Sequence, residues 1–330
     1  MAPPRILVIK LSALGDMILA FPAFARMRVA HPDARITLLT TPPFGDLARR
    51  SPYFDKVETD GRPEGMGGWL KLVTRLRSAR YQRVYDLQAN DRTGLIFQAL
   101  RPFPPAWSGT AAGCALPHRN PDRSTMHSLE RHGDQLRNAG IWPDAPVTPL
   151  SAPPPDVGWM LTTAATVPAA IPKALLVPGA AAHRPEKRWP AALYGDLAAQ
   201  LIAKGYEVDI IGSAQERNLA ATIQARAPAA RDLTGATDLF QIAALGASAA
   251  LAVGNDTGPM HLIAAAGATC VSLFSAASNP ALSAPRGAVT VLRSADFGDL
   301  SVEEVMAKCL PNATPMARNV GDPPREALDR

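Results

Sequence analysis

The chain has 330 residues, enough for two ordinary domains, because single hydrophobic cores stop growing near roughly 250–300 residues. Hydrophobic residues make up 47% of the sequence and charged residues 19%, which excludes a wholly disordered chain. The net charge of +5 favours anionic partners, but the basic residues are scattered and aromatic residues make up only 6%, which disfavours a nucleic-acid platform.

The first third of the sequence alternates predicted strands and helices. Arg5–Lys10 is a nearly continuous apolar run, typical of a strand in a sheet covered on both faces, and Asp16 begins an apolar-periodic helix that extends to about Ala30. The alternation continues with segments at Arg35–Thr40 (strand), Gly45–Arg50 (helix), Trp69–Ala79 (helix), Arg83–Leu87 (strand) and Thr93–Leu100 (helix). Such alternation predicts an α/β layer with right-handed crossovers.

The middle of the chain interrupts this pattern. Prolines become frequent after Arg101, and one helix, at Met126–Ala139, is predicted in isolation. We expect residues 144–172 to connect two domains, with room for a short helix within the connection.

A second α/β series follows the connection. Its predicted strands are Ala174–Val177, Glu207–Ile211, Ala249–Val253, Thr269–Leu273 and Val289–Leu292, and its predicted helices are Ala191–Lys204, Gln215–Ala225, Leu239–Leu245 and Thr257–Ala266. The pattern predicts two domains, 1–150 and 173–310, whose parallel sheets face each other across a cleft, and a Pro-rich tail over 311–330 that frays or lies on the surface. One large doubly wound sheet is the alternative.

Cysteine usage and apolar runs bear on the compartment. Cys114, Cys270 and Cys309 are far apart and form no CxxC or Cys/His cluster, which argues against a disulfide scaffold or a structural zinc site and fits a reducing cytoplasm. No stretch approaches the roughly 18–20 uninterrupted apolar residues of a membrane span. Lys10 and Asp16 close the apolar start, so we expect no signal peptide.

The most informative motif is GNDTGPMH, at Gly254–His261, between the apolar runs AALAV and LIAAAG. It predicts a strand, a glycine-containing turn and a helix that begins at Asp256 or Thr257. Free N–H groups at a helix start favour an anion and Gly258 permits close approach, so one hypothesis is a diphosphate site beyond the strand. The alternative is that Asp256 only caps the helix and His261 is a core residue. The single DTG stands in strand–helix context, which disfavours a pepsin-like protease.

A second motif, LVPGAAAHRPEKRWP at Leu176–Pro190, follows another predicted strand. Its small residues would let the backbone approach a ligand, and the cations Arg184, Lys187 and Arg188 could neutralise phosphate charge. The alternative is a solvated basic loop. Both motifs are expected to open on the same edge of one sheet.

A third segment, KLSALGD at Lys10–Asp16, matches neither a dinucleotide fingerprint nor a P-loop. Asp16 is either a helix N-cap or, because the carboxyl edge of the sheet faces the expected cleft, a general base. No Asp-x-Asp, HExxH or GxSxG pattern occurs, which leaves metal-independent chemistry with basic residues and a helix terminus.

In this order, the segments resemble the heptosyltransferases of glycosyltransferase family 9, which use ADP-heptose in lipopolysaccharide synthesis. The matching pieces are ILVIKLSALGDMILAFPAF, VYDLQANDRTG, PGA…EKRWP, IIGSAQER and GNDTGPMHLIAAAGA, spread over most of Arg5 to about Leu310. The resemblance implies a GT-B fold, in which the C-terminal Rossmann-like domain holds most of the nucleotide sugar. It also implies an inverting, metal-independent transfer of a heptose or related sugar from an ADP-sugar to a lipopolysaccharide-core or other lipid-linked acceptor.

The resemblance also implies roles for single residues. Asp16 would take the proton from the acceptor hydroxyl, and Lys187 would contact the nucleotide phosphates. The implied donor-binding residues, with Glu216 near the ribose, are Gly179, His183, Glu216, Asp256, Thr257, Gly258 and His261. Ala180–Ala182 stand where the family often has phosphate-binding hydroxyls, so backbone N–H groups or His183 would have to substitute.

We therefore expect a cytoplasmic enzyme that needs no metal or cofactor, binds no nucleic acid and contacts the inner membrane peripherally. Loops of the N-terminal domain would bind the acceptor, with Asn90 and Arg92 as candidates and Arg62 and Arg119 beside them. The alternatives are a related transferase for another nucleotide sugar and a non-catalytic nucleotide- or sugar-binding protein on the same scaffold. An NAD-dependent dehydrogenase is disfavoured, because the glycine fingerprint of that class does not occur in the sequence.

Overall fold

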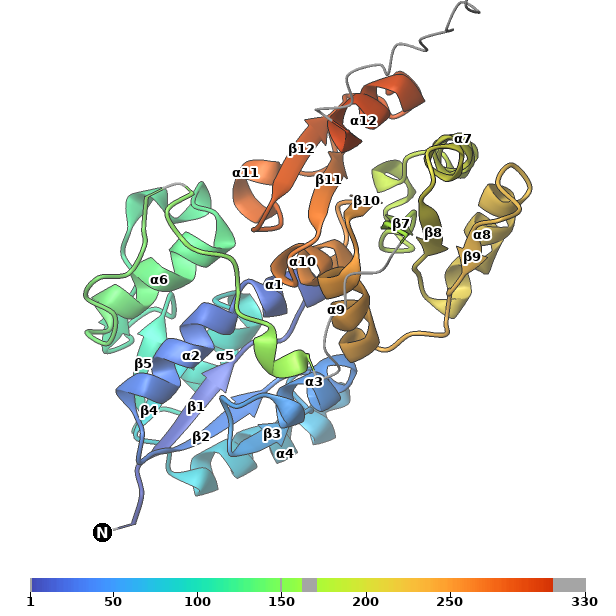
Figure 1. Cartoon of the computed structure of the whole chain (residues 1–330). Coiled ribbons are helices and arrows are strands. Elements are labelled where there is room, and N and C mark those ends of the chain that lie inside the picture. Colours follow the sequence, from blue (N-terminus) through green and yellow to red (C-terminus); the bar gives the residue numbers. More distant parts are fainter. Residues whose placement is uncertain (1, 149, 162–170, 311–330) are drawn as a thin grey trace, which may run out of the picture.

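The chain folds into two parallel sheets covered by helices. The computed structural model describes residues 2–148, 150–161 and 171–310, and over these residues each sheet has six strands (Figure 1). In spatial order, the N-terminal sheet contains β3 (Lys56–Glu58), β2 (Arg35–Leu39), β1 (Arg5–Ile9), β4 (Arg83–Asp86), β5 (Ala106–Gly109) and β6 (Leu116–Pro117). The C-terminal sheet contains β12 (Val289–Arg293), β11 (Thr269–Phe274), β10 (Leu251–Asn255), β7 (Lys173–Val177), β8 (Glu207–Ile210) and β9 (Arg231–Asp232). The predicted fold class is confirmed, and the single-sheet alternative is wrong.

The two sheets share one topology. When the strands of the second sheet are counted from β7, both sheets have the order 3-2-1-4-5-6, typical of a Rossmann fold. The direction of winding reverses between β1 and β4 in one sheet and between β7 and β10 in the other. Open α/β sheets bind ligands beyond the carboxyl ends of the strands at this reversal, so the topology selects the loops after these four strands.

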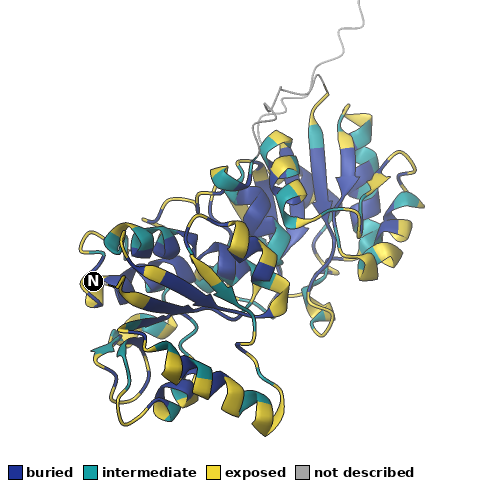
Figure 2. Ribbon diagram, turned by 90° about the horizontal axis from the view of Figure 1, so that it is seen from below, coloured by how far each residue is buried: buried dark blue, intermediate teal, exposed yellow. Residues whose placement is uncertain are grey.

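Helices cover both faces of the sheets, and Figure 2 shows buried strands enclosed by helices whose outer faces are exposed. The helices of the N-terminal half are α1 (Leu14–Ile18), α2 (Phe21–Ala30), α3 (Gly45–Arg50), α4 (Gly65–Ala79), α5 (Asp91–Ala99) and α6 (Ser128–Asn138). Those of the C-terminal half are α7 (Ala191–Ala203), α8 (Arg217–Gln224), α9 (Leu239–Ser248), α10 (Gly258–Ala265), α11 (Pro280–Ser283) and α12 (Val302–Cys309). Among the described residues, no helix has both the length and the hydropathy needed to cross a bilayer.

The single helix predicted from Asp16 to Ala30 is wrong, because the segment forms two helices, α1 and α2. Pro22 is the cause: it has no N–H group to continue a helix from α1, but it is tolerated in the first turn of α2. Asp16 consequently occupies the third position of a five-residue helix and is not its N-cap.

The sequence also missed several short elements. The missed strands and helices are β3, β5, β6, β9, α11 and α12, and α4 begins at Gly65 instead of Trp69. Strands of two to four residues at a sheet edge carry too few residues to show a hydrophobic period.

Part of the predicted connection over 144–172 packs between the two halves. A short 3-10 helix at Gly158–Met160 brings the Trp159 ring within 5.5 Å of the Phe21 ring and 6.1 Å of the Phe240 ring, measured between centroids. Residues 162–170 and the predicted tail over 311–330 lie outside the described residues. The domain boundaries at 150 and 173 remain predictions.

One hydrophobic core extends from the first half into the second. It includes Met17 and Phe21 from α1 and α2, and Val177 and Met260 from β7 and α10. Because α1 packs directly on α10, the helix after the first strand of one sheet touches the helix after the fourth strand of the other (Figure 1).

Candidate functional site

The first turns of α1 and α10 meet at two glycines. A Cβ atom at Gly15 would lie 2.7 Å from Nε2 of His261, and a Cβ atom at Gly258 would lie 2.6 Å from Cβ of Leu14. The absence of a side chain at Gly258 therefore makes room for the other half of the molecule. This contact places α1, which carries Asp16, against the turn that carries Thr257. The sequence motifs predict that these two points face each other across a gap, whereas in the structure the two helices touch.

Asp16 is half-buried and has hydrogen bonds to both carboxylate oxygens. Oδ2 accepts from the backbone N–H of Ala13 at 3.3 Å, and Oδ1 accepts from Oγ of Ser128 at 3.3 Å. Oγ of Ser128 in turn accepts from the guanidinium of Arg131 at 2.9 Å. The carboxylate is thus oriented by its own helix and by α6.

A cluster of buried ionisable side chains lies beside Asp16, at the carboxyl ends of β1 and β4. Lys10, Asp86 and His132 are each no more than 3% exposed. Burial lowers the pKa of Lys10 to about 8, although the charges of Asp16 and Asp86 oppose that shift. Burial raises the pKa of Asp86 to about 6, against hydrogen bonds that include the Ala89 N–H group at 2.8 Å. This edge of the N-terminal sheet therefore holds groups of both charges close to Asp16.

The corresponding edge of the C-terminal sheet is hollow. A pocket of about 570 Å³, within the range of small-molecule sites, opens beyond β7 and β8 and beside the start of α10. Its lining is rich in small residues and includes Gly179, Ala180, Ala181, Ala182, Arg188, Gly212, Ser213, Glu216, Thr237 and Thr257. Side chains of this size leave backbone N–H groups within reach of a ligand.

Two polar side chains shape the wall of this pocket. Glu216 accepts hydrogen bonds from the N–H and Oγ of Ser213, at 2.7 and 3.0 Å, and lies against Gly179 so closely that a Cβ atom there would overlap its carboxylate. Arg188 donates to the carbonyl oxygen of Ala180 at 2.8 Å. Gly179 is thus required for close packing, and the carboxylate of Glu216 is fixed at the pocket wall.

Asp256 forms an ion pair and does not cap α10. Its Oδ2 lies 2.6 Å from Nζ of Lys187, whereas the N-cap of α10 is Thr257, which makes no side-chain capping bond. The alternative in which Asp256 is a plain helix cap is therefore not what the structure shows. Pro259 has no N–H group and the Met260 N–H donates to the Thr257 carbonyl at 3.2 Å, so at this helix start the Gly258 N–H is the group suited to an anion.

His261 lies one turn into α10, buried against α1. Burial lowers the pKa of its imidazole to about 4, although the charges of Asp256 and Asp16 oppose the shift. The ring is therefore neutral near pH 7, and its Nδ1 has no hydrogen-bond partner among the described residues.

The remaining predicted residues lie elsewhere. His183 is exposed and is not part of the pocket lining. Asn90 caps α5, because its Oδ1 accepts from the Thr93 N–H at 3.1 Å, and Arg92 and Arg119 are exposed. Arg62 donates to Oγ of Ser12, four residues before Asp16.

The sequence did not single out Ser128 or Arg131, because they lie on a helix whose contacts with α1 have no local signature. No group of three or more His, Cys, Asp or Glu residues suited to holding a metal occurs among the described residues.

The chain is similar to known proteins over most of its length. Residues 69–299 match the family described as Glycosyltransferase family 9 (heptosyltransferase). Lipopolysaccharide heptosyltransferase 2 of Escherichia coli K12 is 30% identical over 308 residues, which cover 83% of each chain. The enzyme of the same name from Salmonella typhimurium is 30% identical over 292 residues, with the same coverage.

Two solved structures share the fold. The structure of E. coli ADP-heptose lipopolysaccharide heptosyltransferase II is 25% identical and superposes with a TM-score of 0.75, covering 92% of this chain and 97% of that one. The E. coli heptosyltransferase WaaC with ADP is 19% identical, with a TM-score of 0.72 over 94% of this chain and 100% of that one.

Proposed function

Because the chain belongs to glycosyltransferase family 9, the heptosyltransferases, we propose that it transfers a heptose from ADP-heptose to a lipopolysaccharide-core or other lipid-linked acceptor. The observation that supports the proposal is the contact between α1 and α10, which brings the helix that carries Asp16 against the turn at Thr257 and Gly258. The C-terminal side of this contact can hold the donor, and the N-terminal side carries a carboxylate able to accept a proton.

The donor would occupy the pocket of the C-terminal half. The small side chains from Gly179 to Ala182 would let the backbone approach the nucleotide, and Glu216 at the pocket wall would accept a hydrogen bond from the ribose. The diphosphate would lie at the start of α10, where Lys187 could exchange its ion pair with Asp256 for the phosphate oxygens. Solved heptosyltransferases that hold ADP and an ADP-heptose analogue share this fold, which supports ADP as the nucleotide.

In the proposed step the acceptor hydroxyl attacks the anomeric carbon while Asp16 takes its proton. The new carbon–oxygen bond forms as the bond to the β-phosphate breaks, so the configuration inverts and ADP departs. Negative charge develops on the diphosphate, where Lys187 and the Gly258 N–H at the start of α10 would stabilise it; one preorganised donor of this kind is worth about 2.7–4 kcal/mol. These groups would supply the charge without a metal ion.

The acceptor would enter over the N-terminal half. Asn90 and Arg92, with Arg62 and Arg119, remain the candidates to contact it. Of these four, Arg62 donates a hydrogen bond to Ser12, in the loop before Asp16. An acceptor anchored in lipid would bring the enzyme to the cytoplasmic face of the inner membrane as a peripheral protein.

Calorimetric titration with ADP, UDP, GDP and CMP tests the donor assignment. We expect ADP to bind at least about tenfold more tightly than the others, because the pocket must recognise the base as well as the phosphates. Preference for UDP or GDP would favour a transferase for a different nucleotide sugar. Binding of ADP-heptose without transfer to a heptose-deficient lipopolysaccharide core would favour a non-catalytic binding protein.

A further inference from the structure

The first turn of α6 contacts both halves of the molecule. α6 is the helix that stands alone in the sequence, and no residue of it has been assigned to donor binding or to proton transfer. Its N-cap His127 and the residues Ser128 and Glu130 are buried, which is unusual for polar side chains and calls for partners.

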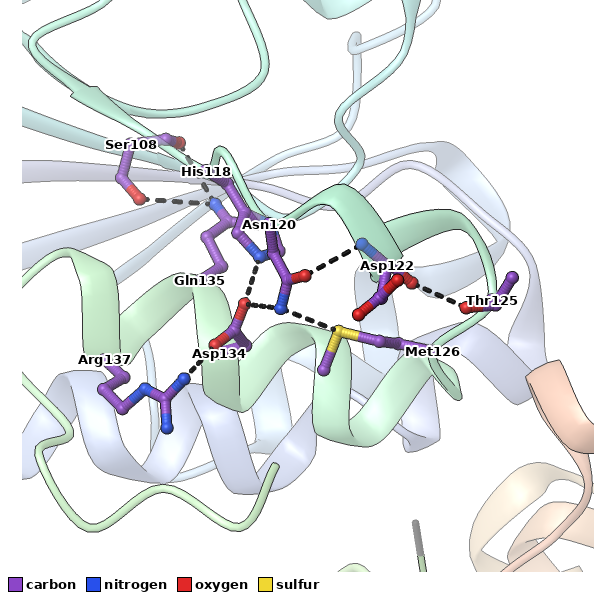
Figure 3. A network of polar contacts seen from close by, with 9 residues as sticks. All are labelled: Ser108, His118, Asn120, Asp122, Thr125, Met126, Asp134, Gln135 and Arg137. Atoms are coloured by element: carbon purple, nitrogen blue, oxygen red, sulfur yellow. Dashed lines mark hydrogen bonds and ion pairs between the residues drawn. The ribbon is translucent and has the colours of Figure 1, made fainter. Parts of the chain in front are cut away.

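The body of α6 is fixed to the N-terminal sheet (Figure 3). Asp134 accepts hydrogen bonds from Nε2 of His118 at 2.7 Å and from Nδ2 of Asn120 at 2.8 Å. Gln135 donates to the carbonyl oxygens of Asp86 and Ser108, at 3.0 and 3.2 Å, directly at the ends of β4 and β5. These buried bonds make α6 a rigid extension of the sheet.

One side of the first turn of α6 holds Asp16. Oγ of Ser128 donates to Oδ1 of Asp16 at 3.3 Å, and Arg131 donates to the same Oγ at 2.9 Å, which leaves the hydroxyl hydrogen free to point at the carboxylate. Ser128 is 3% exposed, so its hydroxyl is shielded from water.

The other side of the same turn binds the C-terminal half. Oε1 of Glu130 lies 2.7 Å from the guanidinium of Arg286, and Nε2 of His127 donates to the carbonyl oxygen of Ala284 at 2.9 Å. Both residues of the ion pair are buried. Burial alone would raise the pKa of Glu130, but the adjacent His127 imidazole and the charge of Arg286 hold the pKa below its ordinary value, so the carboxylate is ionised.

We propose that the first turn of α6 sets the donor-binding half in register with Asp16, with Ser128 as a positioning residue for the Asp16 carboxylate and the Glu130–Arg286 pair as the docking contact. The inference rests on the proposed function, because it assigns Asp16 as the base. Ser128 and Glu130 are two residues apart on one rigid turn, so the side that orients the carboxylate and the side that binds Arg286 cannot move independently. Docking of Arg286 therefore fixes where the donor lies relative to the base.

Ser128→Ala tests the positioning role. We expect kcat for transfer from ADP-heptose to fall about tenfold while KM for ADP-heptose stays the same, because the lost hydrogen bond orients a group that acts only in the reaction step. In an Asp16→Asn background the same substitution is expected to have no further effect on the residual rate. Ser78→Ala, which removes an exposed hydroxyl on α4 that donates to the Arg75 carbonyl, is the matched control. An unchanged kcat in Ser128→Ala, or an equal loss in the Asp16→Asn background, would overturn the role.

Arg286→Met tests the docking contact. It leaves the Glu130 carboxylate buried without its partner, so we expect a fall in kcat of about tenfold or more and a larger radius of gyration by small-angle X-ray scattering. ADP affinity is expected to stay unchanged, because the pocket lies in the C-terminal half. The double variant Glu130→Met with Arg286→Met is expected to recover most of the activity and the compact shape, since an apolar pair replaces a buried ion pair at little cost.

A double variant as impaired as Arg286→Met, or a single variant with wild-type kcat and dimensions, would overturn the docking role. The scattering comparison does not depend on turnover. Absence of transfer by the wild-type protein would therefore refute the proposed function and still leave the docking contact open to its own test.

Discussion

The two sheets have the same strand order but carry very different side chains at their carboxyl edges. At the edge of the N-terminal sheet, Lys10, Asp86 and His132 are buried together beside the hydrogen-bonded carboxylate of Asp16. At the edge of the C-terminal sheet, glycines and alanines leave a pocket of about 570 Å³. The topology thus determines where each site lies, and the side chains determine what each site suits. The charged edge of the N-terminal sheet suits proton transfer, and the open edge of the C-terminal sheet suits binding of a large anion.

Asp16→Asn should have the largest effect, and the effect should be confined to the edge of the N-terminal sheet. We expect kcat to fall about 100- to 10,000-fold, the range that general base catalysis contributes, while the Kd for ADP stays unchanged. The substitution keeps the shape of the side chain and an oxygen that can accept from Ser128. It loses only the long bond accepted from the Ala13 N–H group, so the fold should survive. Turnover is measured with ADP-heptose and ADP binding by calorimetry.

Loss of ADP affinity in this variant would show that the two edges do not act separately, and retention of wild-type turnover would remove Asp16 from the mechanism.

Gly179→Ala should affect the pocket at the edge of the C-terminal sheet and leave the edge of the N-terminal sheet unchanged. The new Cβ atom would overlap the Glu216 carboxylate and force it into the pocket, so we expect the Kd for ADP to rise about 10- to 100-fold, the equivalent of an overpacking cost of about 1–3 kcal/mol. At saturating donor, kcat should stay near that of the wild type. Gly67→Ala is the control, because nothing lies within 4 Å of a Cβ atom there. Equal ADP affinity in both variants would show that Gly179 does not shape the donor site.

The pH dependence of stability tests the burial of His261, which lies where the two edges meet. The pKa of His261 is about 4 in the folded protein, against an ordinary value of 6.5, so below pH 6.5 the unfolded chain binds a proton that the folded chain does not. The free energy of unfolding should therefore fall as the pH falls through this window, by about 2 kcal/mol between pH 6.5 and 5. His261→Gln should remove that part of the slope.

Asp86 acts in the opposite direction, because its raised pKa makes the folded protein the better proton acceptor between about pH 4 and 6. Urea unfolding of wild type and His261→Gln at several pH values separates the two groups, since Asp86 contributes to both proteins. Parallel curves for the two proteins would contradict a buried, neutral His261.

Much of this arrangement follows from local sequence patterns. The runs RILVI, KALLV and LAVGN predict buried strands, and the motifs after them predict that Asp16 and Thr257 lie at facing edges. Pro22 was a readable signal for the break between α1 and α2. The ion pair of Lys187 with Asp256 and the pair of Glu130 with Arg286 could not be predicted, because they join residues 69 and 156 positions apart on surfaces that only the folded chain brings together.

Close packing limits how the two halves can be spaced: Gly15 packs against His261, and Gly258 packs against Leu14. The backbone of each glycine lies against a side chain of the other half, so adding one methyl group at either glycine would act as a spacer and move Asp16 away from the turn at Thr257. The distance between Asp16 and the turn at Thr257 is thus limited at two positions that already hold the smallest residue.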